Sequence, residues 1–376
     1  MDIEFELIPG RKIGKNHPCF IIAEIGQNHQ GDINIAKRMI IEAKEIGADC
    51  VKFQKTDLPS RFNKAALERP YVSLNSWGKT YGEHRKHLEF SEDQFYELYQ
   101  FAQQKDISFS SSGMDKKSVD FLHKLGIPFF KVGSGDSNNF PQLIHTAKFT
   151  KPMVISTGMQ NMETVKKVYD LLMPINKRLC FLLCTSSYPA PPKDIHLNVL
   201  KTYKSELPGA IIGYSGHEVG QEITIAAVAL GAKVVERHLT LNRTWKGSDH
   251  VASLEPQEFK QLVRQIRNVE LALGTTEKVL RDSEIPCYEK TSSEELVGAP
   301  ATDPDVCHRG RDKKKLGKTI VAAKFIPAGT VLTEDMLDVK VAEPKGRRAE
   351  ELSELIGRTA KHDVSYDHSI TDDVVD

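Results

Sequence analysis

Short apolar runs recur along the first two thirds of the chain at intervals that fit one strand plus one helix. Between the first two runs, Ile35, Met39 and Ala43 repeat with helical spacing, and Gly47 can end that helix. Strands that alternate with helices indicate βαβ units and a parallel sheet, and eight such units favour closure into a barrel over an open doubly wound sheet. The runs are 20–23, 50–53, 107–109, 129–132, 153–155, 180–183, 210–213 and 233–236.

The chain of 376 residues is longer than a simple TIM barrel, which needs roughly 250 residues. We therefore expect an α/β protein with a TIM (β/α)8 barrel over residues 1–281, a linker or insertion over 282–312, and a small module over 313–376. The last barrel helix is expected to be capped by Ser253 and stopped by Gly274. Within the module, residues 319–323, 326–330 and 355–358 predict short strands and turns, and the basic run 309–315 before them predicts a solvated linker.

The charge balance and the polar start of the chain limit the class of protein. Fifty-one basic residues offset 51 acidic ones, so no overall field favours nucleic acid or an anionic membrane. No apolar run approaches the roughly 20 residues of a membrane span, and residues 1–6 lack the apolar core of a signal peptide. The six cysteines form no recognisable disulfide pattern. We expect a cytoplasmic protein that acts on small molecules.

Polar residues occur near the carboxyl end of every expected strand, where TIM barrels keep their chemistry. Lys52 and Lys131 each lie inside an apolar strand, and two lysines removed from water favour a shared anion, most simply a phosphate or carboxylate. A lysine that reaches solvent from a strand edge is the alternative for either one alone. The polar set is Glu24, Lys52, Gln54, Ser112, Lys131, Ser134, Thr157, Thr185, Tyr188, Ser215, His217, Glu236 and His238.

His217 and His238 follow adjacent strands, so their imidazoles can converge on one divalent cation. Only two protein ligands are evident, so water and substrate oxygens must complete the shell, which favours catalytic Mn2+ or Mg2+ over structural zinc. Glu24 and Glu236 are candidates to position water or to stabilise positive charge. Asp249, after the eighth strand, can hold substrate hydroxyls or serve as a loop cap.

Read together, these motifs resemble the sialic acid synthase family, and within it the animal-type members. The resemblance spans nearly the whole barrel, and the tail from about residue 315 resembles the antifreeze-like (SAF) domain that follows the barrel in this family. The motifs that carry the resemblance are 20–29 (FIIAEIGQNH), 51–54 (VKFQ), 130–136 (FKVGSGD), 154–159 (VISTGM), 184–189 (CTSSYP), 213–217 (GYSGH) and 236–238 (ERH).

The resemblance implies condensation of phosphoenolpyruvate with an N-acylmannosamine or its 6-phosphate, with C–O cleavage and release of phosphate. It places the metal on His217 and His238. It assigns Gln54, Tyr188 and Asp249 to the sugar. Ser112 and Ser186 stand where bacterial members commonly have Thr and Asn, and both can still hydrogen-bond a ligand oxygen. The residues that it assigns to phosphoenolpyruvate are Lys52, Ser112, Lys131, Ser134, Ser186 and Ser215.

The family also implies a domain-swapped homodimer in which the SAF domain of one subunit covers the partner's barrel and supplies an arginine, for which Arg347 is our candidate. The basic loop 77–87 predicts a grip on a sugar 6-phosphate through Lys79, Arg85 and Lys86. A synthase that uses the unphosphorylated sugar is one alternative. Two others are a class I aldolase with a Schiff base on Lys52 or Lys131, and a degenerate barrel that binds carbohydrate.

Overall fold

The computed structural model describes residues 3–291 and 317–376. It divides the chain into two compact units, Met1–Gly274 and Thr275–Asp376. Much of the linker expected over 282–312, the whole basic run 309–315 and the first residues of the expected module lie outside the described residues. Each unit has its own hydrophobic core.

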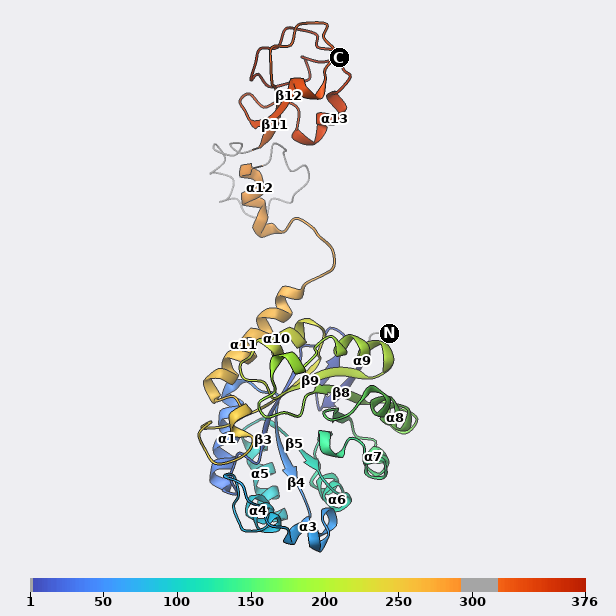
Figure 1. The fold of residues 1–376 in the computed structure, drawn as a ribbon, viewed down its shortest axis with the longest axis vertical. Helices are drawn as coiled ribbons and strands as arrows, with labels where there is room; N and C mark the ends of the chain where they lie inside the picture. Colours follow the sequence, from blue (N-terminus) through green and yellow to red (C-terminus); the bar gives the residue numbers. More distant parts are fainter. Residues whose placement is uncertain (1–2, 292–316) are drawn as a thin grey trace. The chain divides into compact units, whose positions relative to one another are not determined.

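The first unit is a closed barrel of parallel strands, as the sequence predicted (Figure 1). Within the described residues eight strands close the ring, and the last of them, β10, pairs with the first, β3. Every expected run lies in one of these strands or begins one residue before it. The strands are β3 (Phe20–Gly26), β4 (Cys50–Lys55), β5 (Ser108–Gly113), β6 (Phe130–Val132), β7 (Met153–Ser156), β8 (Leu179–Cys184), β9 (Ile211–Gly216) and β10 (Val234–His238).

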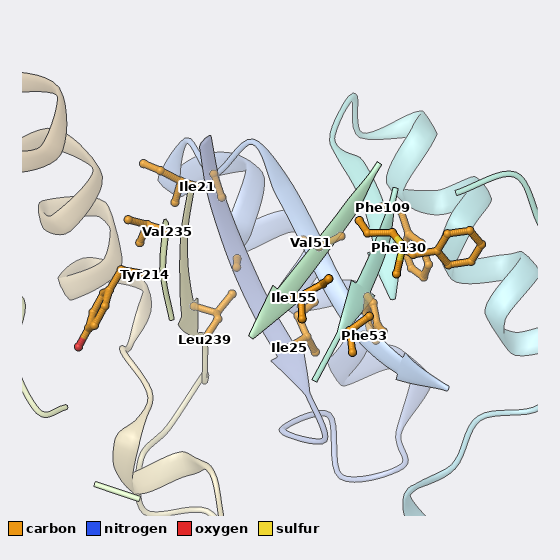
Figure 2. Packing of buried hydrophobic residues seen from close by; sticks show 14 of the residues in the cluster. Ile21, Ile25, Val51, Phe53, Phe109, Phe130, Ile155, Tyr214, Val235 and Leu239 are labelled. Carbon is orange, nitrogen blue, oxygen red and sulfur yellow. The ribbon is translucent and has the colours of Figure 1, made fainter. Parts of the chain in front are cut away.

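Helices cover the outer face of the barrel, because alternate side chains of each strand point outward and are apolar. Figure 2 shows Ile21, Val51, Phe109 and Val235 in this outer core. No helix in the described part of the chain is both long and apolar enough to cross a bilayer. The helices of this unit are α1 (Ile33–Ile46), α2 (Leu58–Arg61), α3 (Lys64–Glu68), α4 (Tyr81–Leu88), α5 (Glu92–Gln104), α6 (Lys116–Leu125), α7 (Phe140–Ala147), α8 (Met162–Leu172), α9 (Val199–Glu206), α10 (Glu222–Ala229) and α11 (Pro256–Leu273).

A β-hairpin that the sequence did not predict precedes the barrel, formed by β1 (Glu4–Ile8) and β2 (Arg11–Gly14). Its apolar side chains Phe5, Leu7 and Ile13 form one buried cluster with inward-facing residues from the amino-terminal ends of the barrel strands, among them Phe20 and Val234. The hairpin therefore closes the amino-terminal end of the barrel with apolar side chains. The opposite, carboxyl end of the barrel is called the mouth below.

The second unit is small and built mainly of turns around a short antiparallel pair, β11 (Lys318–Ala322) and β12 (Leu337–Val341). The expected strand at 319–323 is confirmed by β11, whereas 355–358 contains the end of α13 (Leu352–Leu355) and a turn. Helix α12 (Ile285–Thr291) precedes the pair in the chain. The compact core of the second unit includes Ile320, Leu332 and Ile370.

The hairpin gives a test of how the barrel is stabilised. Replacing Leu7, which is 1% exposed, by alanine should lower the free energy of unfolding of the barrel unit by about 2–5 kcal/mol, because it leaves a cavity against the barrel interior. Both tryptophans, Trp77 and Trp245, belong to this unit. Urea unfolding followed by tryptophan fluorescence therefore measures the barrel alone.

The matched control is Leu271→Ala at a site 82% exposed, where the change should stay within about 0.5 kcal/mol. Equal losses in the two variants would contradict a structural role for the hairpin.

Candidate active site

Four side chains of opposite charge lie together inside the barrel, on strands β3, β4, β6 and β10. Lys52 Nζ lies 2.8 Å from Glu24 Oε2 and 3.9 Å from Glu236 Oε1, and Lys131 Nζ lies 3.3 Å from the same Glu236 oxygen. Ser112 Oγ accepts a hydrogen bond from Lys52 Nζ at 3.2 Å. None of the four is more than 5% exposed. The carboxylate of Glu236 thus lies near both lysines.

Burial and nearby charges shift the pKa values of the two glutamates in opposite directions. Burial raises the pKa of the Glu24 carboxyl to about 7, although the charge of Lys52 opposes this. Burial also raises the pKa of Glu236, but the charges of Lys131 and Lys52 outweigh it and hold that pKa below its ordinary value. Glu24 also accepts a hydrogen bond from Gln54 Nε2 at 2.9 Å. Glu24 is therefore the carboxyl suited to exchange a proton near neutral pH.

Small hydroxyl residues surround Gly158 beside this cluster. A Cβ at Gly158 would lie 2.2 Å from Ser186 Oγ and 2.8 Å from Ser134 Oγ, so both hydroxyls face the space that the glycine leaves open. The Gly158 amide donates to Ser134 Oγ at 3.0 Å. Ser215, 3% exposed, lies on β9 in register with Glu236. These hydroxyls, with the two ammonium groups, suit a small dianion.

The two histidines lie at the mouth with the ring of Tyr188 between them and solvent. The ring centroids of His217 and His238 are 5.4 Å apart, and Tyr188 lies 4.1 Å from His217. His217 Nδ1 lies 2.8 Å from the Thr185 carbonyl oxygen, so it donates to that oxygen. Burial lowers the pKa of His238 to about 3, although the nearby Asp249 carboxylate opposes this. Burial alone would lower the pKa of His217, but its contact with the Cys184 side chain outweighs burial and raises that pKa above its ordinary value. The His238 ring is therefore the one held neutral by its surroundings.

The donor set fits a divalent cation. Because His217 Nδ1 donates to a backbone carbonyl, its Nε2 is left as a lone-pair donor, the arrangement usual for metal-binding histidines. His238 Nδ1 is buried without a hydrogen-bond partner, and Asp249 Oδ2 lies 4.0 Å from it. In the described ranges no three His, Cys, Asp or Glu side chains converge to hold a metal by themselves. Water and substrate oxygens would have to complete the coordination.

Two buried charges that the sequence analysis did not single out hold the loop that carries His217. Arg237 is fully buried, and its Nη1 donates to Glu218 Oε1 at 2.8 Å and to Thr224 Oγ1 at 2.8 Å. Glu218 also accepts from the Tyr214 hydroxyl at 2.8 Å. Glu218 follows His217 directly, so the network ties the loop that carries His217 to β10 and α10. The sequence does contain a signal for Arg237. It is a charged residue between Glu236 and His238, and because successive side chains of a strand point to opposite faces, it must lie on the outer face of the barrel.

The residues expected to grip a sugar phosphate differ in their surroundings. Lys79 and Lys86 are exposed to solvent, whereas Arg85 is only 9% exposed on α4. Asp249 lines a hollow of about 260 Å3, partly open to solvent, at the mouth of the barrel. The basic loop is therefore divided between side chains in solvent and one buried guanidinium.

In the second unit, Arg347 is held by carboxylates of its own unit. Its guanidinium lies 2.8 Å from Asp372, 3.3 Å from Glu351 and 3.7 Å from Glu354. A role in binding a substrate would require some of these ion pairs to be exchanged.

Comparisons with known proteins match both units. Residues 39–278 match the NeuB family, and residues 317–375 match the SAF domain. The chain is 55% identical to N-acetylneuraminate-9-phosphate synthase of Homo sapiens, and equally to that of Mus musculus, over 100% of this chain and 98% of each relative. The crystal structure of N-acetylneuraminic acid (sialic acid) synthetase from Leptospira borgpetersenii in complex with citrate aligns with a TM-score of 0.67 at 32% identity, covering 76% of this chain and 95% of that one.

Proposed function

The chain belongs to the NeuB family, and from that premise we infer that it condenses phosphoenolpyruvate with N-acetylmannosamine 6-phosphate to give N-acetylneuraminate 9-phosphate and phosphate. The phosphorylated acceptor follows from the relatives that match it over the full chain, which are named as 9-phosphate synthases. One observation in the structure carries the proposal. The buried lysine pair, the serines around Gly158 and the two histidines face one barrel mouth.

Phosphoenolpyruvate carries a phosphate and a carboxylate, and the barrel offers donors for both. Lys52 and Lys131 supply positive charge in a site from which water is excluded, which strengthens their attraction for an anion. Ser134 and Ser186 can donate to phosphate or carboxylate oxygens at the gap left by Gly158. We assign these residues, together with Ser112 and Ser215, to the binding of phosphoenolpyruvate.

The sugar binds nearer the mouth, where Gln54, Tyr188 and Asp249 can hold its hydroxyls. Carbon 3 of phosphoenolpyruvate attacks the open-chain aldehyde carbon, and the new C–C bond leaves positive charge at carbon 2. The carboxylate of Glu24 stabilises that charge and accepts the proton of the water that adds to carbon 2. The aldehyde oxygen, which becomes an alkoxide when the C–C bond forms, takes up the proton that Glu24 received from the water. The tetrahedral adduct then collapses: its carbon-2 hydroxyl becomes the keto oxygen, the C–O bond to phosphate breaks, and phosphate leaves with the hydroxyl proton. Glu236, which holds both lysines in place, is the reserve candidate for the role of Glu24.

We assign His217 and His238 as the ligands of a divalent cation, Mn2+ or Mg2+. The bound ion would supply Lewis-acid polarisation of the aldehyde, an effect worth several kcal/mol. The Thr185 carbonyl and the Glu218–Arg237 pair orient His217, so the protein itself sets the direction of that ligand.

We propose that the protein acts as a domain-swapped homodimer in which the SAF domain of one subunit covers the partner's barrel mouth and contributes Arg347. The loops that follow the barrel strands expose several large apolar side chains at that mouth, which favours a cover. A location in the cytoplasm accords with the free thiols of Cys19, Cys50 and Cys180. The exposed apolar residues on these loops are Val72, Leu74, Met159, Val219 and Val251.

The first functional test is product formation. The purified protein with phosphoenolpyruvate and N-acetylmannosamine 6-phosphate should release inorganic phosphate in step with the keto acid, and Lys131→Ala should lose most of this activity, since it removes a buried cation from the phosphoenolpyruvate site. Phosphate release is measured continuously, and borohydride trapping is run beside it. A covalent adduct on Lys52 or Lys131, with no phosphate release, would establish a Schiff-base aldolase instead.

The second test concerns the metal. Dialysis against a chelator should abolish turnover, and Mn2+ or Mg2+ should restore it. His217→Ala and His238→Ala should each lower kcat by at least about 100-fold because each removes one of only two protein ligands. Circular dichroism of both variants checks the fold. Full activity in the presence of chelator would rule out the metal site.

The third test asks whether the SAF domain covers the barrel of the partner subunit or the barrel of its own chain. A chain lacking residues 313–376 keeps an intact barrel, and full-length Lys131→Ala keeps an intact lid. Each should be nearly inactive alone, yet their mixture should recover activity because a heterodimer pairs the intact barrel with the intact lid. As the control, the truncated chain carrying Lys131→Ala should give no recovery. Heterodimers that form without recovered activity would contradict the swapped arrangement.

A further inference from the structure

The hollow lined by Asp249 has one end beside His238, one of the two proposed metal ligands. Asp249 lines it and lies 4.0 Å from His238 Nδ1. Its other walls come from the turn after β3, through Gln27, from the long loop before α4, through Trp77, and from α4 itself, through His84. The hollow thus extends from the proposed metal ligands towards the segment that the sequence marked as basic.

A buried cation without an anionic partner stands behind this hollow. Arg85 is 9% exposed, and within the part of the chain that the structure describes no carboxylate forms an ion pair with it. Its Nε has no hydrogen-bond partner, and Nη2 donates to Thr56 Oγ1 at 3.3 Å. The charge of Arg85 acts on the pKa of Glu89, but Glu89 forms its ion pair with Lys55, at 2.6 Å. A buried guanidinium without a counter-ion is costly, so the site is built to receive an anion.

Gln27 connects this charge to the hollow. With its amide oxygen turned towards the guanidinium, Gln27 accepts hydrogen bonds from Arg85 Nη1 at 2.6 Å and from Nη2 at 3.1 Å. That orientation leaves the amide NH2 group of Gln27 as a donor at the wall of the hollow.

Two further donors line the hollow. Lys246 lies with its Nζ 4.5 Å from the centroid of the Trp77 ring, and no carboxylate of the described residues pairs with it. His84 accepts the Trp77 backbone amide on Nδ1 at 3.3 Å, which leaves its proton on Nε2 as a donor. Burial, and then the charges of Arg85, His87 and Lys246, lower the pKa of His84. Positive charge from Arg85, His87 and Lys246 therefore acts on this histidine.

We propose that the hollow is the subsite for the 6-phosphate of the acceptor sugar, with Lys246, His84 and Gln27 as its donors and Arg85 as the buried charge behind them. The inference rests on the proposed function and deepens it. An open-chain aldose carries its aldehyde and its 6-phosphate at opposite ends. The aldehyde belongs at the histidines, Asp249 meets the hydroxyls between, and the phosphate reaches the cationic end. This assignment replaces Lys79 and Lys86, which are exposed, by Lys246 and His84.

The test is the specificity ratio, kcat/KM for N-acetylmannosamine 6-phosphate divided by that for free N-acetylmannosamine, at saturating phosphoenolpyruvate. Lys246→Gln should lower this ratio at least about tenfold, mainly by raising the KM for the phosphorylated sugar, because the contact is made equally in the ground state and the transition state. The KM for phosphoenolpyruvate should not change. Lys246 is exposed, so its replacement leaves the fold intact. Arg85→Gln, checked by circular dichroism, should lower the ratio as well.

Lys64→Gln is the matched control, since Lys64 is an exposed lysine on α3 outside the hollow, and its ratio should equal that of the wild type. A ratio within about threefold of wild type in both Lys246→Gln and Arg85→Gln overturns the subsite. A fall in Lys79→Gln or Lys86→Gln without one in Lys246→Gln also overturns it, in favour of the exposed lysines. Wild-type protein that releases no phosphate with either sugar overturns the function itself, and the subsite with it.

Discussion

The attraction between the two lysines and two glutamates inside the barrel is the interaction on which the active site depends. Water is excluded from these groups, so each charge is tolerable only because an opposite charge lies within about 4 Å. Glu236 contacts both lysines and keeps the pair together before any ligand arrives. A dianion that enters this site meets cations whose positions are already set, so little reorganisation is needed when it binds.

The barrel divides its interior into an apolar half and a polar half along the same strands. Inward-facing positions alternate, so β3 presents Phe20 and Ile22 near its start and Glu24 near its end, and β10 presents Val234 and then Glu236. The apolar half, together with the hairpin, supplies the hydrophobic stabilisation that offsets the cost of burying charge. The polar half can then be specialised for binding and chemistry without loss of the fold.

The sequence predicted the barrel and the proximity of its charged strand-end residues, because apolar runs and strand-end polar residues are local signals. It did not predict the hairpin, in which Phe5 and Leu7 alternate with acidic residues and depend on contacts with distant strands. It expected Ser253 to cap the last helix, but Glu255 does so, because Ser253 Oγ accepts from Asn28 and donates to the Asp249 carbonyl. The burial of Arg85 likewise follows from tertiary packing that no local pattern records.

The hairpin at the amino-terminal end has a kinetic consequence. In the described part of the barrel unit, the hairpin and the apolar inward-facing side chains close the amino-terminal end, so ligands of the proposed site enter and leave through the mouth. The lysines that we assign to phosphoenolpyruvate lie inside the barrel, whereas Tyr188 and Asp249 lie at its rim. A sugar seated at the rim blocks the way in. Under the proposed assignments, phosphoenolpyruvate therefore binds first, the sugar second, and the large product departs from the rim.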